Sequence, residues 1–509
     1  MKGVAATGHP LTTQAALDML QQGGNAFDAA IAAGFASVVT EPALTSFGGG
    51  GFFLSHTAKE KKDVLFDFFV NTPGTGRTET ILPEMTATPI EFPGCTQIFH
   101  TGYGSIAVPG VLKGLLHVHA SLCTLPLKEI MKPALSCLEE GLEINARQEI
   151  FLNLLRPIMT SSAYGRSMYM RNGRYVQLGD KVYNPALKDF CHKLAEGKAD
   201  IYSGETAAAL SQTMKKNGGM VTKDDLEAYS VIEREPLRIH YRDRVIHTNP
   251  PPSTGGILLA LGLSLLGEVN LAACSRESEA FYVSLIEAMK EMTTFSPGQK
   301  GKLLLYPGLG AKQSPSVQAY LKNIADRVPL SSRGTTHISV IDNEGNAASM
   351  TTSNGSGSGC HIPGTGIMLN NMMGEDDLHP GGFHASPPNK RVSSMMIPTI
   401  VMKRGRVDCA LGSGGSKRIR TAVLQALINI IDYAMPIEKA IESHRVHYED
   451  GTVHIEPGMS DSLLQQLQKH YKINRWDRKD MFFGGVHCAG STMDGWGDSR
   501  RGGNFGTVL

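Results

Sequence analysis

The sequence predicts an α+β fold in which sheets are covered by helices on both sides, and three observations support this prediction. Strand-like segments occur in two groups, one from about residue 50 to residue 70 and the other from residue 237 onward, mostly after residue 334. Between the two groups, the region from Val111 to Leu226 has a mostly helical pattern. At 509 residues the chain exceeds the size at which one hydrophobic core keeps growing, so a large layered enzyme fold or two lobes is expected.

A tight helical hairpin is predicted near the amino terminus. Thr12 or Thr13 can cap a helix through Leu20, and Asn25 can cap a second, alanine-rich helix through Val39. These caps satisfy amide groups that would otherwise lack partners in the first turn of each helix.

The remaining segments complete the two groups of strands and add helices beside them. Strands are predicted at residues 52–54, 64–70, 237–241, 245–247, 336–342, 347–353, 396–402 and 407–411. Helices are predicted at residues 256–266, 278–292 and about 417–433.

Residues 296–333 form the best candidate for a break in the chain. Their composition shifts to Pro, Gly, Ser, Lys and Gln with little periodicity, which is typical of a mobile surface connection. We therefore expect any break in the chain to fall in this region.

The composition excludes several classes of function. The net charge is +1, so no affinity for nucleic acid or an anionic membrane is indicated. No apolar stretch approaches the ~20 residues of a membrane span, and no signal peptide is evident, so a soluble cytoplasmic protein is expected. A missing upstream segment would make it secreted or periplasmic instead.

The cysteines and histidines indicate neither a disulfide framework nor a metal site. The 8 cysteines are scattered singly, which is typical of reduced thiols. His117 and His119 lie two apart on a predicted helix and therefore face different sides, and no HExxH motif occurs. No metal and no cofactor is expected.

Two alternating strands from Thr335 to Asn354 are predicted to form a β-hairpin. A short loop with Gly345 in the left-handed conformation would pair Ile341 with Ala347, and the register then sets Thr335 opposite Ser353. Two hydroxyl groups would therefore face each other at the open end of the hairpin. Threonine and serine also simply suit a half-exposed strand, so this pairing alone does not establish a site.

The residue before Thr335 suggests self-cleavage. The Thr335 hydroxyl could attack the carbonyl of Gly334, move the acyl group from nitrogen to oxygen, and let water release a new amino terminus. A threonine hydroxyl needs an adjacent base at neutral pH, and an amino-terminal threonine supplies its own amine for that purpose.

A glycine-rich segment follows the strand predicted at residues 407–411. It reads Gly-Ser-Gly-Gly-Ser from Gly412 and precedes the long helix, so its backbone amides could stabilise an oxyanion. A phosphate-binding loop is an alternative, but the spacing GxxxxGK[ST] is absent; a purely structural turn remains the other alternative. Adjacent hydroxyls at Ser393 and Ser394, ahead of another strand, could hold a polar substrate group.

These motifs together resemble the gamma-glutamyltranspeptidase family over almost the whole chain. The matching segments are QQGGNAFDAAIAAGFASVVTEP, SFGGGGFF, TTHISVIDNEGNAAS, GIMLNNMM, SSMMIPTIV and GSGGSKRI, in that order. The resemblance implies a four-layer αββα amino-terminal-nucleophile hydrolase, made as a precursor that cuts itself between Gly334 and Thr335. The two fragments, residues 1–334 and residues 335–509, would stay together as a heterodimer, with a dimer of heterodimers as a further candidate assembly.

The resemblance also implies roles for individual residues. Thr335 is the expected nucleophile, and Ser353 replaces a threonine whose hydroxyl bonds the nucleophile's amine. Gly414 and Gly415 are expected to form the oxyanion hole. The carboxylate end of the substrate is expected to be held by Ser393 and Ser394.

Departures from the family pattern concern the substrate more than the chemistry. Phe69 stands where members that use glutathione have an arginine that grips the glutamyl α-carboxylate. Met372 replaces a glutamine, and Glu375 is the candidate replacement for the acidic group that reads the α-ammonium. Asn354 lies beside the position of an expected asparagine. Two charged side chains near the serine pair, Lys390 and Arg391, are exposed candidates for the missing cation.

Three hypotheses follow for the function. The first is a hydrolase or transferase that cleaves gamma-glutamyl amides such as glutathione through an acyl-Thr335 ester, with water, an amino acid or a peptide as acceptor. The second is an acylase of the same family for a dicarboxylic acyl amide without the amino group. The third, from another class, is a catalytically silent binding protein, which the intact nucleophile and glycine motifs argue against.

Overall fold

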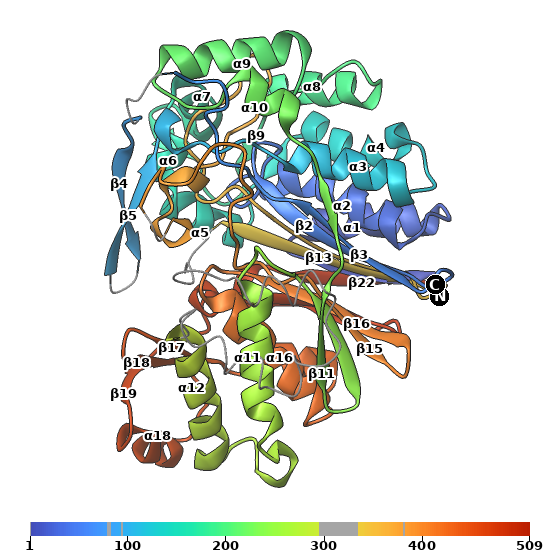
Figure 1. The fold of residues 1–509 in the computed structure, drawn as a ribbon, viewed down its shortest axis with the longest axis vertical. Helices are drawn as coiled ribbons and strands as arrows, with labels where there is room; N and C mark the ends of the chain where they lie inside the picture. The colour runs from blue at the N-terminus through green and yellow to red at the C-terminus, as the bar shows by residue number, and fades with distance from the viewer. Residues whose placement is uncertain (1, 79–82, 93–94, 295–333, 380–381) are drawn as a thin grey trace.

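Two stacked β-sheets form the centre of the protein and helices cover both outer faces, which makes four layers (Figure 1). The structure is a computed structural model, and it describes residues 2–78, 83–92, 95–294, 334–379 and 382–509. The four-layer arrangement confirms the expected αββα fold.

The first sheet has seven antiparallel strands and includes both ends of the described chain. Its order is β10 (Ile232–Arg234), β3 (Lys62–Phe68), β2 (Gly50–Thr57), β14 (Ala347–Ser353), β13 (Thr335–Asp342), β1 (Gly3–Thr7) and β22 (Asn504–Val508). The two chain ends therefore lie side by side, as Figure 1 shows.

The second sheet has six strands, all antiparallel to their neighbours. Its order is β11 (Leu237–Tyr241), β12 (Arg244–Thr248), β15 (Thr399–Lys403), β16 (Arg406–Gly414), β20 (Gly485–Gly490) and β21 (Gly495–Gly497). In both sheets, strands from before residue 334 pair with strands from after it.

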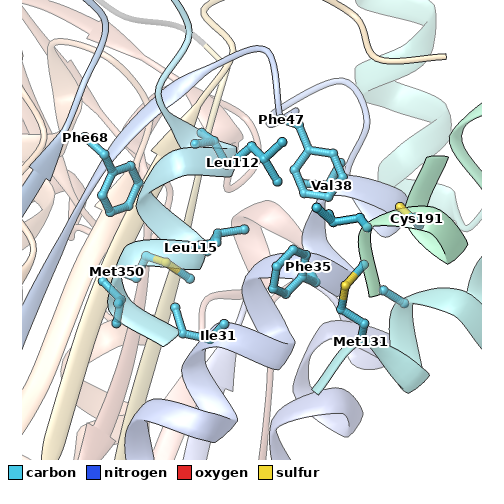
Figure 2. Packing of buried hydrophobic residues seen from close by; sticks show 14 of the residues in the cluster. Ile31, Phe35, Val38, Phe47, Phe68, Leu112, Leu115, Met131, Cys191 and Met350 are labelled. Carbon is cyan, nitrogen blue, oxygen red and sulfur yellow. The ribbon is translucent and has the colours of Figure 1, made fainter. Parts of the chain in front are cut away.

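The outer face of the first sheet is covered by a layer of helices. They are α1 (Pro10–Gln21), α2 (Ala26–Thr40), α3 (Val111–Leu122), α4 (Leu127–Glu140) and α8 (Pro185–Ala195). Helix α2 is buried along its whole length because it packs between the sheet and its neighbouring helices. Figure 2 shows Ile31 and Phe35 of α2 against Leu112 and Leu115 of α3, with Met350 reaching up from β14. This packing holds the β13–β14 hairpin to the helical layer.

The outer face of the second sheet, which points away from the first sheet, is covered by α11 (Gly255–Gly267), α12 (Glu279–Thr294) and α16 (Arg418–Ile431), with α17 (Ile437–Glu442) and α18 (Asp461–Gln468) beside them. The remaining elements lie at the periphery. They are helices α5 (Ala146–Leu154), α6 (Arg156–Met159), α7 (Ala163–Tyr169), α9 (Gly204–Lys216) and α10 (Lys223–Ala228), and strands β4 (Thr86–Phe92), β5 (Cys95–Thr101), β6 (Leu142–Glu143), β7 (Met170–Arg171), β8 (Arg174–Tyr175), β9 (Lys181–Val182), β17 (Val446–Glu449), β18 (Thr452–Ile455) and β19 (Lys472–Arg475).

Several predicted boundaries differ from the structure. Helix α1 begins at Pro10 and its side-chain cap is His9, so the prediction of a Thr12 or Thr13 cap was wrong. Both threonines are buried in the helix instead, because they bond to groups in neighbouring elements. Strand β15 starts at Thr399 and not at residue 396, since Pro398 cannot donate to a ladder.

Other differences are strands that the sequence did not predict, and one predicted segment cannot be compared with the structure. The strands β1 and β22 were not predicted, and β16 continues three residues further than expected, to Gly414. Asn25 does cap α2, in a reciprocal capping box with Asp28. The segment 296–333, with its predicted mobility and break, lies outside the described residues, so the division at residue 334 stays a prediction.

Asp342 at the tip of the β13–β14 hairpin supports a stability prediction. Its buried carboxylate accepts hydrogen bonds from the amides of Ala26, Glu344 and Asn346 and from the Asn346 side chain, at 2.8–3.0 Å. Asp342→Ala leaves these donors without that acceptor, so we expect a loss of about 2–4 kcal/mol in the free energy of unfolding, measured by urea denaturation. The exposed neighbour substitution Glu344→Ala should change it by less than about 0.5 kcal/mol; equal losses would contradict this role for Asp342.

Candidate active site

The β13–β14 hairpin has the register that the sequence predicted. Ile341 pairs with Ala347, and Thr335 pairs with Ser353 at the open end. Gly345 in the loop has φ +90°, the left-handed conformation that the short connection requires. The pairing of the two hydroxyl-bearing residues is therefore confirmed.

Alternation along β13 directs the Thr335 side chain toward the second sheet. Ile338 and Val340 belong to the core beneath the helices, so the residues of opposite parity, Thr335 and His337 among them, face inward between the sheets. Thr335 is 0% exposed, and its hydroxyl has no hydrogen-bond partner among the described residues. A buried hydroxyl without a partner is unusual and points to a chemical role rather than a structural one.

Ser353 connects the hairpin to the bond before Thr335. Its hydroxyl donates to the carbonyl oxygen of Gly334 and accepts a hydrogen bond of 3.0 Å from the amide of Gly355. A Cβ atom at residue 334 would lie 2.0 Å from the Gly355 carbonyl oxygen, so only glycine fits there. A hydrogen bond to the Gly334 carbonyl would polarise it toward attack by a nearby nucleophile.

The glycine-rich segment lies against the main chain of Thr335. A Cβ atom at residue 414 would lie 2.2 Å from the Thr335 carbonyl oxygen, so the close approach of β16 to β13 depends on Gly414. Gly415 follows with φ +121°, and α16 begins at Arg418. The segment is therefore a strand end and turn beside Thr335, and Gly414 belongs to the strand rather than to the start of the helix.

Polar side chains between the sheets fix the distance from Thr335 to this segment. His337 bonds through its two ring nitrogens to the hydroxyls of Thr351, at 2.8 Å, and Ser339, at 2.9 Å. Ser349 donates to the carbonyl oxygen of Leu411 in β16, at 3.0 Å, and accepts from the amide of Thr399 in β15. Burial lowers the pKa of His337 well below its usual range, so its imidazole is neutral.

Glu375 and Asn371 lie beside the chain that follows Ser353. A Cβ atom at Gly355 would be 2.2 Å from the side-chain oxygen of Asn371 and 2.5 Å from a carboxylate oxygen of Glu375. Asn354 is fully buried, and its side-chain amide donates to the carbonyl oxygen of Leu369, at 3.4 Å. The structure therefore gathers Asn354 and Glu375 near the Thr335 end of the hairpin.

Ser393 and Ser394 lie ahead of β15, at the end of the second sheet where β16 reaches Gly414. The Ser393 hydroxyl donates to the Pro252 carbonyl oxygen, at 2.9 Å, and the Ser394 hydroxyl accepts from the Met396 amide, at 3.2 Å. Both hydroxyls are thus engaged with main-chain groups.

The positions that depart from the family pattern form an apolar cluster between the sheets. Phe69 and Met372 are each 0% exposed and belong to one buried cluster that also contains Met396. The Phe69 ring stacks on that of Phe52 with 5.4 Å between centroids. These side chains are uncharged, so they do not replace the positive charge of the expected arginine.

Arg391 was expected to be exposed, and this expectation was wrong. Its side chain is 5% exposed and its Nε lies 3.2 Å from the fully buried carboxylate of Asp67. The rest of the guanidinium donates to Phe69, Tyr229 and Ser230. Its positive charge therefore stabilises Asp67, because a buried carboxylate needs a partner. Lys390 is exposed, as predicted.

The sequence analysis missed two charged residues next to Thr335. Arg501 donates to the Thr335 carbonyl oxygen, at 3.3 Å, and Glu41 accepts a 2.6 Å hydrogen bond from the hydroxyl of Thr336. Because the contacts join residues 166 and 295 positions apart, no local pattern could indicate them.

The described residues contain no group of three or more His, Cys, Asp or Glu side chains placed to hold a metal ion. None of the described helices combines the length and apolar character needed to cross a bilayer.

The contact between Gly412 and His337 yields a second stability prediction. A Cβ atom at residue 412 would lie 2.3 Å from the imidazole, which cannot move without breaking its bonds to Thr351 and Ser339. Gly412→Ala should therefore lower the free energy of unfolding by about 2–4 kcal/mol in urea denaturation. Gly267→Ala is the matched control, because its nearest neighbour would be 3.9 Å away; a control loss of the same size would refute the argument.

Comparisons with known proteins agree with this geometry. The family model described as Gamma-glutamyltranspeptidase matches residues 12–296 and 309–508. The chain is 30% identical over 502 residues to the glutathione hydrolase proenzyme of Escherichia coli K12, covering 92% of this chain and 85% of that protein. It is 32% identical over 515 residues to the acylase ACY 1 proenzyme of Pseudomonas sp. strain V22, covering 97% and 90%.

Solved structures have the same fold. The cephalosporin acylase from Bacillus halodurans superposes with a TM-score of 0.81 at 24% identity, covering 100% of this chain and 96% of that one. The gamma-glutamyltranspeptidase of Helicobacter pylori gives a TM-score of 0.50 at 28% identity, covering 62% and 88%. The chain belongs to the gamma-glutamyltranspeptidase family and is an enzyme with the amino-terminal-nucleophile hydrolase fold.

Proposed function

We propose that this enzyme cleaves gamma-glutamyl amides such as glutathione through an ester on Thr335, after cutting its own chain between Gly334 and Thr335. The observation that carries the proposal is the buried Thr335 hydroxyl, which has no described partner. It belongs to a residue that follows the Gly334 carbonyl bound by Ser353 and whose own main-chain carbonyl lies against Gly414 of β16. Three parts of an acyl-transfer site therefore meet at one residue.

Self-cleavage begins when the Thr335 hydroxyl attacks the carbonyl carbon of Gly334. The C–N bond to Thr335 breaks, an ester to the threonine oxygen forms, and the nitrogen becomes a free amine. Water then hydrolyses the ester, which leaves a carboxylate on Gly334 and an amino-terminal Thr335. Ser353 would support the first step by its hydrogen bond to the Gly334 carbonyl.

In the mature enzyme the Thr335 amine takes the proton of the Thr335 hydroxyl as the oxygen attacks the substrate amide. Negative charge on the substrate oxygen would be stabilised by the backbone amides of Gly414 and Gly415. The departing amine carries away the proton, and water, an amino acid or a peptide then takes the acyl group from Thr335.

The other candidate residues would bind the substrate. We assign the carboxylate end to Ser393 and Ser394 and the amino group to Glu375, with Asn354 beside them. The fragments 1–334 and 335–509 would remain together as a heterodimer, because β13 and β14 of the second fragment pair with β1 and β2 of the first.

Replacement of the nucleophile tests the proposal directly. Thr335→Ala should stay a single chain in intact-mass analysis, whereas the wild type gives two chains, the smaller beginning at Thr335. The variant should also release no p-nitroaniline from gamma-glutamyl-p-nitroanilide, a loss of at least about 10³-fold in kcat. A wild type that is folded, uncut and inactive toward all amides would favour the silent binding protein.

A second candidate is an acylase for dicarboxylic acyl amides without an α-amino group. Phe69 and Met372 favour it, because this apolar cluster supplies no carboxylate or amide acceptor for an α-ammonium group, and a dicarboxylic acyl group without the amino group needs none. One relative of the chain, the ACY 1 proenzyme reported above, is named an acylase.

The substrate preference separates the two candidates. If the apolar cluster governs recognition, kcat/KM for glutaryl-p-nitroanilide should exceed that for gamma-glutamyl-p-nitroanilide by about tenfold or more. Both anilides carry the same carboxylate, but only the gamma-glutamyl group has an α-ammonium, and burying that charge without a partner costs more than about 1.4 kcal/mol. A reversed ratio would support gamma-glutamyl transfer and would mean that other groups, such as Glu375, bind the α-ammonium. Thr335→Ala is the background control for both amides.

A further inference from the structure

A buried carboxylate lies behind Thr335, on the face of β13 opposite its hydroxyl. Glu41 follows the last residue of α2 and accepts hydrogen bonds from the hydroxyls of Thr336, at 2.6 Å, and Thr12, at 3.3 Å. A Cβ atom at Gly8 would lie 2.4 Å from the same carboxylate, so the neighbouring strand β1 leaves it just enough room. Glu41 is thus packed tightly against the residue that follows Thr335.

A buried guanidinium contacts both halves of the candidate site. Arg501 donates to the Thr335 carbonyl oxygen, at 3.3 Å, and its terminal nitrogens would lie 3.1 Å and 3.2 Å from Cβ atoms at Gly414 and Gly415. Its guanidinium also lies over the ring of Phe151, 5.6 Å from the centroid. Arg501 therefore touches the nucleophilic residue and the oxyanion segment at once.

The two charges belong to one cluster. Glu41 and Arg501 line the same small cavity, of about 20 Å³, and each influences the ionisation of the other. The other ionisable groups at this cavity are His9 of the α1 cap and Arg147 of α5. Arg501 is also influenced by Asp498, Asp480 and Arg418, and Glu375 lies near Gly355 at the end of the hairpin.

Self-cleavage would change what holds Thr335 in place. Before the cut, peptide bonds anchor the residue on both sides; after it, only the bond through its own carbonyl remains. A chain end of this kind frays unless other contacts hold it. Besides the pairing of β13 with β14, two side-chain contacts hold this end, the bond from Arg501 to the Thr335 carbonyl and the bond from Thr336 to Glu41.

We propose that Arg501, together with the buried carboxylate of Glu41, holds Thr335 against the Gly414–Gly415 segment as a positioning residue and tunes the Thr335 amine as a base. This inference rests on the proposed nucleophile. It adds two residues from opposite ends of the chain that act through Thr335 without touching the substrate.

The protonation states of the pair give the proposal a measurable signature. Burial raises the pKa of Glu41 to about 7 and lowers the pKa of Arg501 to about 10, so both are charged at pH 8. Burial also lowers the pKa of His9 to about 4, so His9 is neutral there. The positive charge of Arg501 favours the neutral amine, whereas the negative charge of Glu41 favours its protonated form.

The test measures kcat, KM and the pH dependence of kcat for Arg501→Gln, Arg501→Lys and Glu41→Gln with the preferred p-nitroanilide. We expect Arg501→Gln to lower kcat at least about 30-fold with KM changed less than threefold, and Arg501→Lys to recover part of the loss. The acidic limb of the kcat profile should move to higher pH in Arg501→Gln and to lower pH in Glu41→Gln, by about one pH unit each. Opposite shifts cannot arise from a general loss of stability.

Asp432→Asn is the matched control. Asp432 is also a buried carboxylate, bound by Arg242 at 2.9 Å and Tyr241 at 2.7 Å, but it lies beyond the far end of α16. The Asp432→Asn substitution should lower the thermal unfolding temperature without changing kcat or the pH profile of kcat. If Arg501→Gln fails to fold, the shift in Glu41→Gln and the kcat of Arg501→Lys decide the question.

The outcomes separate this inference from the proposed function. Folded Arg501→Gln that stays uncut, with cleavage restored in Arg501→Lys, supports the positioning role at the first step. Wild-type kcat and unshifted profiles in cleaved variants would overturn it while leaving Thr335 as the nucleophile. An inactive, uncut wild type would instead remove the nucleophile on which both depend.

Discussion

Contact between the two sheets is the constraint on which the candidate site depends. Thr335 belongs to the first sheet and Gly414 to the second, so no secondary structure element sets the distance between them. That distance follows from the absence of a side chain at Gly412 and Gly414 and from hydrogen bonds that cross the interface, such as that from Ser349 to Leu411. A polar layer of this kind is costly to bury unless every group is paired, which makes its geometry specific. The Thr335 hydroxyl belongs to that layer and has no hydrogen-bond partner among the described residues.

Charge is distributed unevenly around Thr335. Where the family resemblance places an arginine, the chain has the buried, stacked ring of Phe69, and the nearby Arg391 is paired with Asp67. On the opposite side of β13 lies the negative charge of Glu41, and Arg501 adds a positive charge at the Thr335 carbonyl. The chain thus has fixed charges behind the nucleophile and an apolar wall beside it. This arrangement is compatible with the acylation chemistry of the family at Thr335 and with an acyl group that differs from gamma-glutamyl.

The sequence predicted local features well because they depend on neighbouring residues. Asn25 capped its helix, Gly345 formed the hairpin turn, and the period of two then placed Thr335 opposite Ser353. The strands β1 and β22 escaped prediction because they are short and become strands only by pairing with each other and with β13. Arg501 and Glu41 escaped for the same reason, since their roles arise from contacts over more than 160 residues. The burial of Arg391 depended on Asp67, which the local pattern could not reveal.

The position of β22 and Arg501 along the chain bears on how the protein is made. Thr335 leaves the ribosome well before Arg501, which follows it by 166 residues. At about 5–20 residues per second, translation of that stretch takes on the order of ten seconds. For most of this time the residues of β20, which pairs with β16, and of β22, which pairs with β1, have not been synthesised. The order of synthesis therefore delays assembly of the site until the second half of both sheets is available, so a nascent chain cannot present a complete reactive centre early.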